Sequence, residues 1–123
     1  MGEVEVRPAT IFIDLDGTIV KHNYNPQEQM DELLPGSLKL LRRWKAEGHK
    51  IILTTARDTR DCRMFLNAMR EQLSFTFDDV ITGITAGPRF LINDRKHPDA
   101  DKAIAFNLDR NVGLVGLEED WKY

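Results

Sequence analysis

The sequence predicts one α/β domain over residues 1–123, a three-layer α/β/α fold with a central, mostly parallel sheet. Short apolar runs alternate along the chain with longer stretches whose apolar residues have helical spacing, the pattern typical of a parallel sheet covered by helices. The length fits one domain with its own core. Hydrophobic residues make up 41% and charged residues 30% of the chain, which excludes a largely disordered protein.

The N-terminal part predicts two strands and an irregular loop. Val4 and Val6 alternate with charged residues and indicate a short edge strand that ends at Pro8. Residues 9–15 are nearly continuously apolar, as expected for a central strand with both faces covered. Residues 17–34 are polar and irregular, so we expect no regular element there.

Two helices flank the second strand in the middle of the chain. The first begins at Ser37, a suitable N-cap, and ends at Gly48. Residues 49–54 follow as an apolar strand, and the second helix spans about 58–73. The apolar face of the first helix comprises Leu38, Leu40, Leu41 and Trp44. The apolar face of the second comprises Cys62, Phe65, Leu66, Met69 and Leu73.

The C-terminal part predicts three further strands. Residues 77–81 form the third, and the turn-rich stretch 83–88 connects it to a fourth over 89–93. A short helix or turn covers about 98–103. Alternating apolar residues then indicate a fifth strand over 104–108.

Charge and cysteine content narrow the classes of function. The net charge is -3, from 17 basic and 20 acidic residues that are interspersed, so we expect no nucleic-acid groove. Cys62 is the only cysteine and is expected in the core, and a lone thiol fits a reducing compartment, the cytoplasm. We expect no membrane partner, because no apolar run approaches the roughly 20 residues of a membrane helix. The N-terminus also lacks a signal-peptide pattern.

Polar residues stand where several predicted strands end. Asp14 closes the first strand, Thr54 and Thr55 the second, and Asn93 and Asp94 the fourth. Ligands of parallel sheets bind beyond the carboxyl ends of the strands. The sequence therefore predicts a site at this edge of the sheet.

Two carboxylates lie two residues apart in this edge, at Asp14 and Asp16. Residues i and i+2 of an extended segment point to the same side, and like charges so close need a cation. With Asp94 as a third oxygen donor, the set suits Mg²⁺. The metal leaves the second carboxylate available as a general acid and base.

These residues carry a resemblance to the haloacid dehalogenase-like superfamily of phosphatases and phosphotransferases. The matching motifs are D-L-D-G-T at 14–18, I-I-L-T-T-A-R at 51–57 and F-L-I-N-D at 90–94, within roughly residues 9–112. The resemblance implies a Rossmann-like core. It also implies that Asp14 is the nucleophile that forms an aspartyl-phosphate. Asp16 would protonate the leaving oxygen and then activate water, while Asp14, Asp16 and Asp94 would bind Mg²⁺.

The resemblance assigns the phosphate contacts as well. Gly17 would allow the tight turn after the aspartates, and the Thr55 hydroxyl would hold phosphoryl oxygens. Thr55 is preferred to Thr54, because T-A-R is similar to the common T-G-R of the family. Arg57 is either a surface residue or a cation that meets the substrate at the rim.

The chain departs from the family pattern at the cation near the last motif. The family usually has a lysine there, often in a G-K-P-like loop, whereas this chain reads A-G-P-R-F. Arg89 and Lys96 are the two candidates for its role, and the sequence does not decide between them. Asp99 could orient metal waters, although a polar loop explains it as simply.

The expected activity is Mg²⁺-dependent hydrolysis of a small phosphorylated molecule, a phosphate monoester. Residues 17–34 are too few for a folded cap domain, so we expect a capless, open site that accepts large substrates or is covered by another subunit of a homo-oligomer. The similar capless proteins favour sugar phosphates or polysaccharide precursors. Nucleotide or nucleic-acid 3′-phosphates are an alternative substrate class. A non-hydrolytic Mg²⁺- and phosphate-binding scaffold or sensor is the alternative function.

Overall fold

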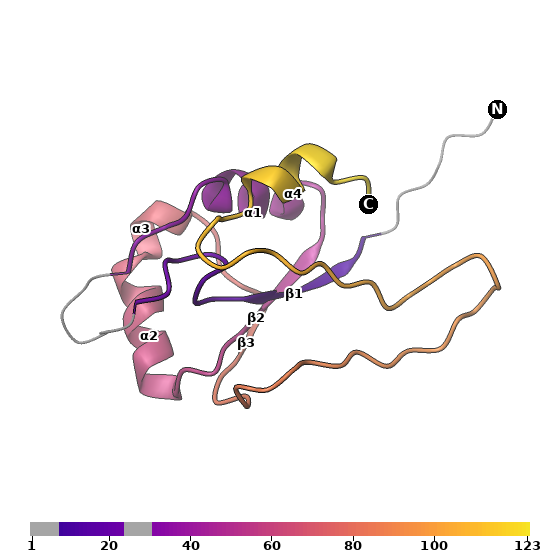
Figure 1. Cartoon of the computed structure of the whole chain (residues 1–123). Coiled ribbons are helices and arrows are strands. Elements are labelled where there is room, and N and C mark those ends of the chain that lie inside the picture. The colour runs from indigo at the N-terminus through magenta and orange to yellow at the C-terminus, as the bar shows by residue number, and fades with distance from the viewer. Residues whose placement is uncertain (1–7, 24–30) are drawn as a thin grey trace.

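A computed structural model of the chain describes residues 8–23 and 31–123. Its core is a parallel sheet of three strands, β1 (Thr10–Asp14), β2 (Lys50–Thr54) and β3 (Asp79–Ile81), in the order β1-β2-β3. The sheet with its flanking helices confirms the predicted α/β, Rossmann-like fold class (Figure 1). The edge strand expected around Val4 and Val6 lies outside the described residues.

The strand register places the carboxyl ends of the three strands at one edge of the sheet, the rim, as the sequence predicts. Asp14 pairs with Thr54 across β1 and β2, and Thr54 pairs with Ile81 of β3. All three strands therefore end at the same edge, because parallel strands point the same way. The polar residues that follow β1 and β2 are held side by side there.

Helix α1 (Ser37–Ala46) packs its apolar face on the sheet, as its spacing predicts. The prediction that Ser37 caps this helix is wrong: Gly36 is the N-cap, and the buried Ser37 hydroxyl donates to the Ile19 carbonyl at 2.9 Å. This bond fixes the loop after β1 to the start of α1. The helix ends before Gly48, whose positive φ of 86° reverses the chain.

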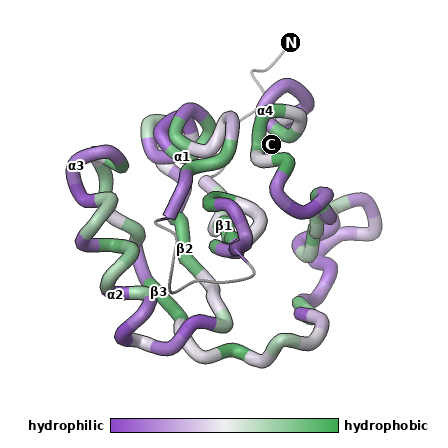
Figure 2. The backbone as a smooth tube through the Cα atoms, turned by 60° about the vertical axis from the view of Figure 1, so that its left-hand side comes forward, coloured by the Kyte–Doolittle hydropathy of each residue, from purple (hydrophilic) through white to green (hydrophobic). Residues whose placement is uncertain are grey.

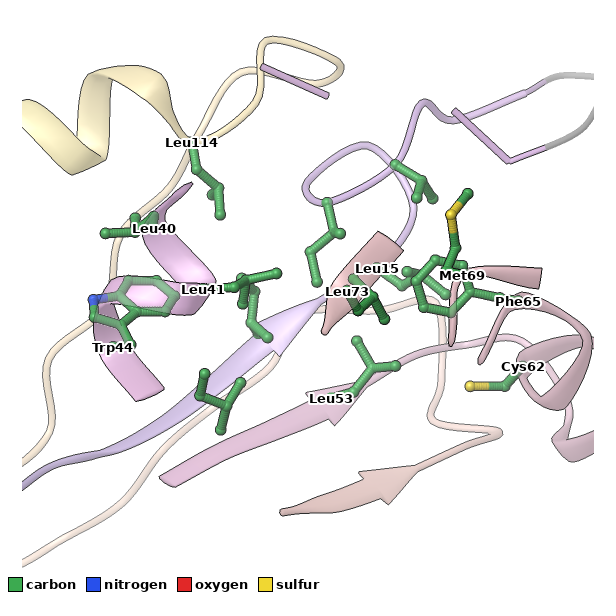
Figure 3. Packing of buried hydrophobic residues seen from close by; sticks show 14 residues of the cluster. Leu15, Leu40, Leu41, Trp44, Leu53, Cys62, Phe65, Met69, Leu73 and Leu114 are labelled. Atoms are coloured by element: carbon green, nitrogen blue, oxygen red, sulfur yellow. The ribbon is translucent and has the colours of Figure 1, made fainter. Parts of the chain in front are cut away.

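The second predicted helix is divided in two. Helix α2 (Thr59–Ala68) is capped by Asp58, whose carboxylate accepts the Asp61 N–H at 2.8 Å, and α3 (Arg70–Leu73) follows a break at Met69. Cys62 and Phe65 of α2 turn toward Leu53 of β2 in the packed core (Figure 3). The prediction that Cys62 belongs to the core is confirmed, and burial raises the pKa of its thiol.

The expected strands 89–93 and 104–108 are not formed in the described structure, and both predictions are corrected. Phe90 and Ile92 are 86% and 92% exposed. Figure 1 shows the segment after β3 as an extended arm that runs away from the helices and returns toward the C-terminus. A strand needs a neighbour that completes its hydrogen bonds, and an apolar run in the sequence does not supply that neighbour. Of the expected helix or turn at 98–103, a turn at residues 98–99 is present.

Helix α4 (Val115–Asp120), which follows the returning arm, was not predicted from the sequence. Figure 2 shows α4 beside α1 above the sheet, with the arm curving around the far side of β1. Trp121 after α4 packs edge-on against Trp44 of α1, with ring centroids 5.0 Å apart. The C-terminal residues are therefore part of the same packed unit as the sheet.

A close backbone contact joins this C-terminal segment to the start of α1. The Leu114 N–H donates to the Pro35 carbonyl at 2.8 Å, and a Cβ on Gly113 would lie 2.3 Å from the same oxygen. Gly113 also has a φ of 90°, a backbone conformation that residues with a side chain rarely adopt. Both the space and the dihedral angle require glycine here.

Gly113→Ala is expected to lower the free energy of unfolding by about 2–5 kcal/mol, the sum of a left-handed penalty and an overpacking penalty. Gly48→Ala is the matched control, because its φ is 86° and nothing lies within 4 Å of the added Cβ. We expect that variant to lose only about 1–2 kcal/mol. Urea unfolding of both variants measures the difference, and equal losses would contradict the packing argument.

Candidate functional site

Asp14 and Asp16 lie at the carboxyl edge of β1, as the sequence predicts. Asp14 is the last residue of β1, and the Thr18 hydroxyl donates to its Oδ2 at 3.2 Å. The Asp14 and Asp16 side chains are 32% and 29% exposed, so both remain open to solvent. Between β1 and the following loop, Gly17 adopts a φ of 83° and donates its N–H to Val20 at 2.7 Å. The predicted tight turn at Gly17 is confirmed.

Each of the two carboxylates has an arginine partner. Arg89 Nη2 lies 3.1 Å from Asp14 Oδ1. Arg57 holds Asp16 by a forked contact, with Nη2 2.6 Å from Oδ1 and Nε 3.0 Å from Oδ2. Such two-point guanidinium–carboxylate pairs are strong and fix the relative orientation of the groups. The arginines thus relieve the repulsion between the neighbouring aspartates.

Arg57 has a second carboxylate partner that the sequence did not reveal. Its Nη2 also donates to Asp31 Oδ1 at 2.7 Å, and its Nη1 to Asp31 Oδ2 at 3.3 Å. Hydrogen bonds to Asp16 first, and then to Asp31, raise the pKa of Arg57 above its ordinary value despite partial burial. Arg57 is therefore a partly buried cation that two carboxylates engage.

The two threonines after β2 are used differently. The Thr54 hydroxyl donates to the Ile13 carbonyl at 3.2 Å, which occupies its proton within the sheet. The Thr55 hydroxyl accepts the Arg57 N–H at 3.1 Å and keeps its own proton for another acceptor. This difference is in keeping with the expectation that Thr55, rather than Thr54, contacts phosphate.

The two candidate cations occupy different surroundings. Arg89 lies beside Asp14. Lys96 is exposed on the arm, and within the described part of the chain it makes no hydrogen bond or ion pair. Asp99 is exposed on the same arm. Of these three residues, the structure brings only Arg89 to the aspartates.

The structure does not bring Asp94 together with Asp14 and Asp16. Asp94 is exposed, and its recorded hydrogen bonds are with the neighbouring Asn93 amide at 3.2 Å. Within residues 8–23 and 31–123, no group of three or more His, Cys, Asp or Glu side chains could hold a metal ion. The expected Mg²⁺ site is thus not assembled in this arrangement, because its third ligand follows a strand that has not formed.

Asn111 is a second residue that the sequence analysis missed. Its N–H donates to the Gly17 carbonyl at 2.9 Å, and its Oδ1 accepts the His22 N–H at 2.6 Å. Asn111 has a φ of 65°, a conformation that asparagine tolerates better than most residues. It therefore joins the two ends of the loop at residues 17–22, which directly follows Asp16. Asparagine is common in turns, so the sequence held no specific signal for this role.

The sequence profile of the haloacid dehalogenase-like hydrolases matches residues 11–78, more than half of the chain. The match includes Asp14, Asp16 and Thr55 and ends before Arg89 and Asp94. No curated protein and no solved structure matches the chain. The chain belongs to the family of haloacid dehalogenase-like hydrolases.

Proposed function

We propose that this hydrolase is a phosphomonoesterase that works through an aspartyl-phosphate at Asp14. The supporting observation is the pair Asp14 and Asp16 at the carboxyl edge of β1, each open to solvent and each beside an arginine. Nucleophile and acid must differ in their surroundings to take different roles. Here Asp14 has a single contact with Arg89, whereas Asp16 has a forked contact with Arg57.

In the first step, an Asp14 oxygen attacks phosphorus while the bond to the leaving oxygen breaks. Asp16 gives its proton to that oxygen, so the alcohol leaves neutral. Arg89 reduces the repulsion between the Asp14 carboxylate and the phosphate dianion. In the second step, Asp16 takes a proton from water, which attacks phosphorus, and the bond to Asp14 breaks. Inorganic phosphate leaves and Asp14 returns to a carboxylate.

Mg²⁺ remains a proposed cofactor, because the family resemblance implies it and Asp14 and Asp16 have the right oxygen donors. When bound, such a metal neutralises charge on the phosphoryl group. The arrangement of the described residues does not bring Asp94 to these donors. The steps above depend on the side chains of Asp14, Asp16 and Arg89.

The substrate class proposed is a small phosphorylated metabolite, with sugar phosphates or polysaccharide precursors first and nucleotide or nucleic-acid 3′-phosphates as the alternative. A cytoplasmic location and a homo-oligomer that covers the site are also proposed. Among the described residues, no helix is both long and apolar enough to cross a membrane.

A panel of phosphorylated metabolites tests the proposal, with inorganic phosphate release measured in Mg²⁺ and again in a chelator. We expect release from at least one compound, and a loss of activity when the metal is removed. Absence of release from every compound at high protein concentration would contradict the proposal. That result would favour the non-hydrolytic phosphate-binding scaffold or sensor.

A further inference from the structure

The Arg57 side chain lies between two carboxylates that come from different parts of the chain. Asp16 follows β1, and Asp31 lies in the segment between β1 and α1. The Arg57 and Asp31 side chains are each 19% exposed. Contacts among such partly buried charged groups are screened less by solvent than surface pairs are. The Asp31 contact is therefore strong enough to influence where Arg57 lies.

The backbone of Arg57 and the place of its guanidinium group have contacts other than those with the aspartates. Its N–H donates to the Thr55 hydroxyl at 3.1 Å, and its carbonyl accepts the Gly83 N–H at 2.8 Å. Its guanidinium carbon lies 6.0 Å from the centroid of the buried Phe65 ring. The orientation of the guanidinium plane then depends on its carboxylate partners, to which its five donors present a rigid fork.

Asp31 restricts that orientation in addition to Asp16. Arg57 Nη2 contacts Asp16 Oδ1 and Asp31 Oδ1 at 2.6 and 2.7 Å, so one nitrogen is shared between the two carboxylates. Without Asp31, one side of the guanidinium would lose its partner. The plane could then rotate, and the Asp16 carboxylate that is bonded to it would rotate as well.

We propose that Asp31 is a positioning residue that orients the carboxylate of Asp16 through Arg57. The proposal rests on the proposed function, in which Asp16 gives a proton to the leaving oxygen. A small error in the position of a catalytic group costs large factors in rate. Asp31 itself touches neither substrate nor nucleophile in this scheme.

This role has a consequence that a purely structural role lacks. A p-nitrophenolate group leaves readily without a proton, whereas an alkoxide needs one. Misplacing Asp16 should thus slow the cleavage of an alkyl phosphate more than the cleavage of p-nitrophenyl phosphate. The constant kcat/KM reports the steps up to formation of the aspartyl-phosphate, where this protonation occurs.

The test measures kcat/KM for p-nitrophenyl phosphate and for glycerol phosphate in the wild type and three variants. For Asp31→Ala we expect the alkyl-to-aryl ratio of kcat/KM to fall about tenfold, a fraction of the 10²–10⁴ that general acid catalysis supplies. Asp31→Glu keeps the carboxylate and should restore part of the ratio. Asp101→Ala is the matched control, because it removes another arginine–aspartate pair, Arg95–Asp101 at 2.7 Å, and should leave the ratio unchanged.

Four outcomes would overturn the proposal. An equal loss on both substrates would show that Asp31 supports the fold or the nucleophile, and an effect confined to KM would make Asp31 a binding residue. An unchanged ratio in an active Asp31→Ala enzyme would refute the positioning role and leave the proposed function intact. A wild type that cleaves neither ester, nor any compound of the panel, would refute the proposed function and the role of Asp31 with it.

Discussion

Replacing Asp14 with asparagine is expected to abolish phosphatase turnover, with a loss of kcat on the order of 10⁴-fold or more, as when other enzymes lose their nucleophile. The amide cannot attack phosphorus as a carboxylate does. Its oxygen can still accept the Thr18 hydroxyl, which now lies 3.2 Å from Asp14 Oδ2. Release of inorganic phosphate from p-nitrophenyl phosphate measures the change.

The same substitution should leave the fold intact. Asp14 is 32% exposed and its arginine partner Arg89 is 46% exposed, and ion pairs with that exposure contribute at most about 1 kcal/mol to stability. The thermal midpoint should therefore change by only a few degrees. Asp101→Asn serves as the control, since it alters an aspartate with an arginine partner away from the rim and should keep full activity. An Asp14→Asn enzyme with the wild-type rate would refute the aspartyl-phosphate mechanism.

The second large effect is expected at the cation beside the nucleophile. Arg89→Ala should lower kcat/KM by about 10²–10³-fold, the magnitude typical of losing one charged or hydrogen-bonding group that stabilises a transition state. The physical reason is the 3.1 Å contact between Arg89 Nη2 and Asp14 Oδ1. Without the guanidinium, the repulsion between the Asp14 carboxylate and the incoming phosphate is larger.

Lys96→Ala is the matched comparison, because Lys96 is the other candidate cation and is exposed on the arm. We expect it to keep the wild-type kcat/KM. Arg89→Lys should recover only part of the activity, since lysine has the charge but lacks the planar fork of donors. If Lys96→Ala were inactive and Arg89→Ala active, the lysine would hold the role, and the arm would have to place it at the rim during catalysis.

Local patterns in the sequence predicted the parts of the fold that local burial controls. Strands β1 and β2 and helix α1 were predicted within a few residues, because their apolar periodicity reflects which side chains face the core. The break at Met69 was missed, since the apolar positions continue through it at helical spacing. The strand over 89–93 was predicted wrongly, because apolar content measures propensity and a sheet requires a partner.

The residues of the candidate site were likewise predicted where the pattern is local and missed where the contact is long-range. The sequence identified Asp14, Asp16 and Gly17, which are neighbours along the chain and share one turn. It left Arg89 and Lys96 undecided and gave Arg57 two interpretations. It missed Asp31 and Asn111 altogether, because each acts on a residue 26 or more positions away.

The sequence by itself determined the family, the parallel α/β core and the pair of aspartates that ends the first strand. These follow from short-range patterns, because the buried strand, the two aspartates and the glycine turn are neighbours along the chain. Only the tertiary structure decided which groups surround that pair. It joined Arg57 to both Asp16 and Asp31, brought Arg89 to Asp14 and left Asp94 apart from them. Contacts between side chains distant in sequence depend on how whole segments pack, and no local pattern records that packing.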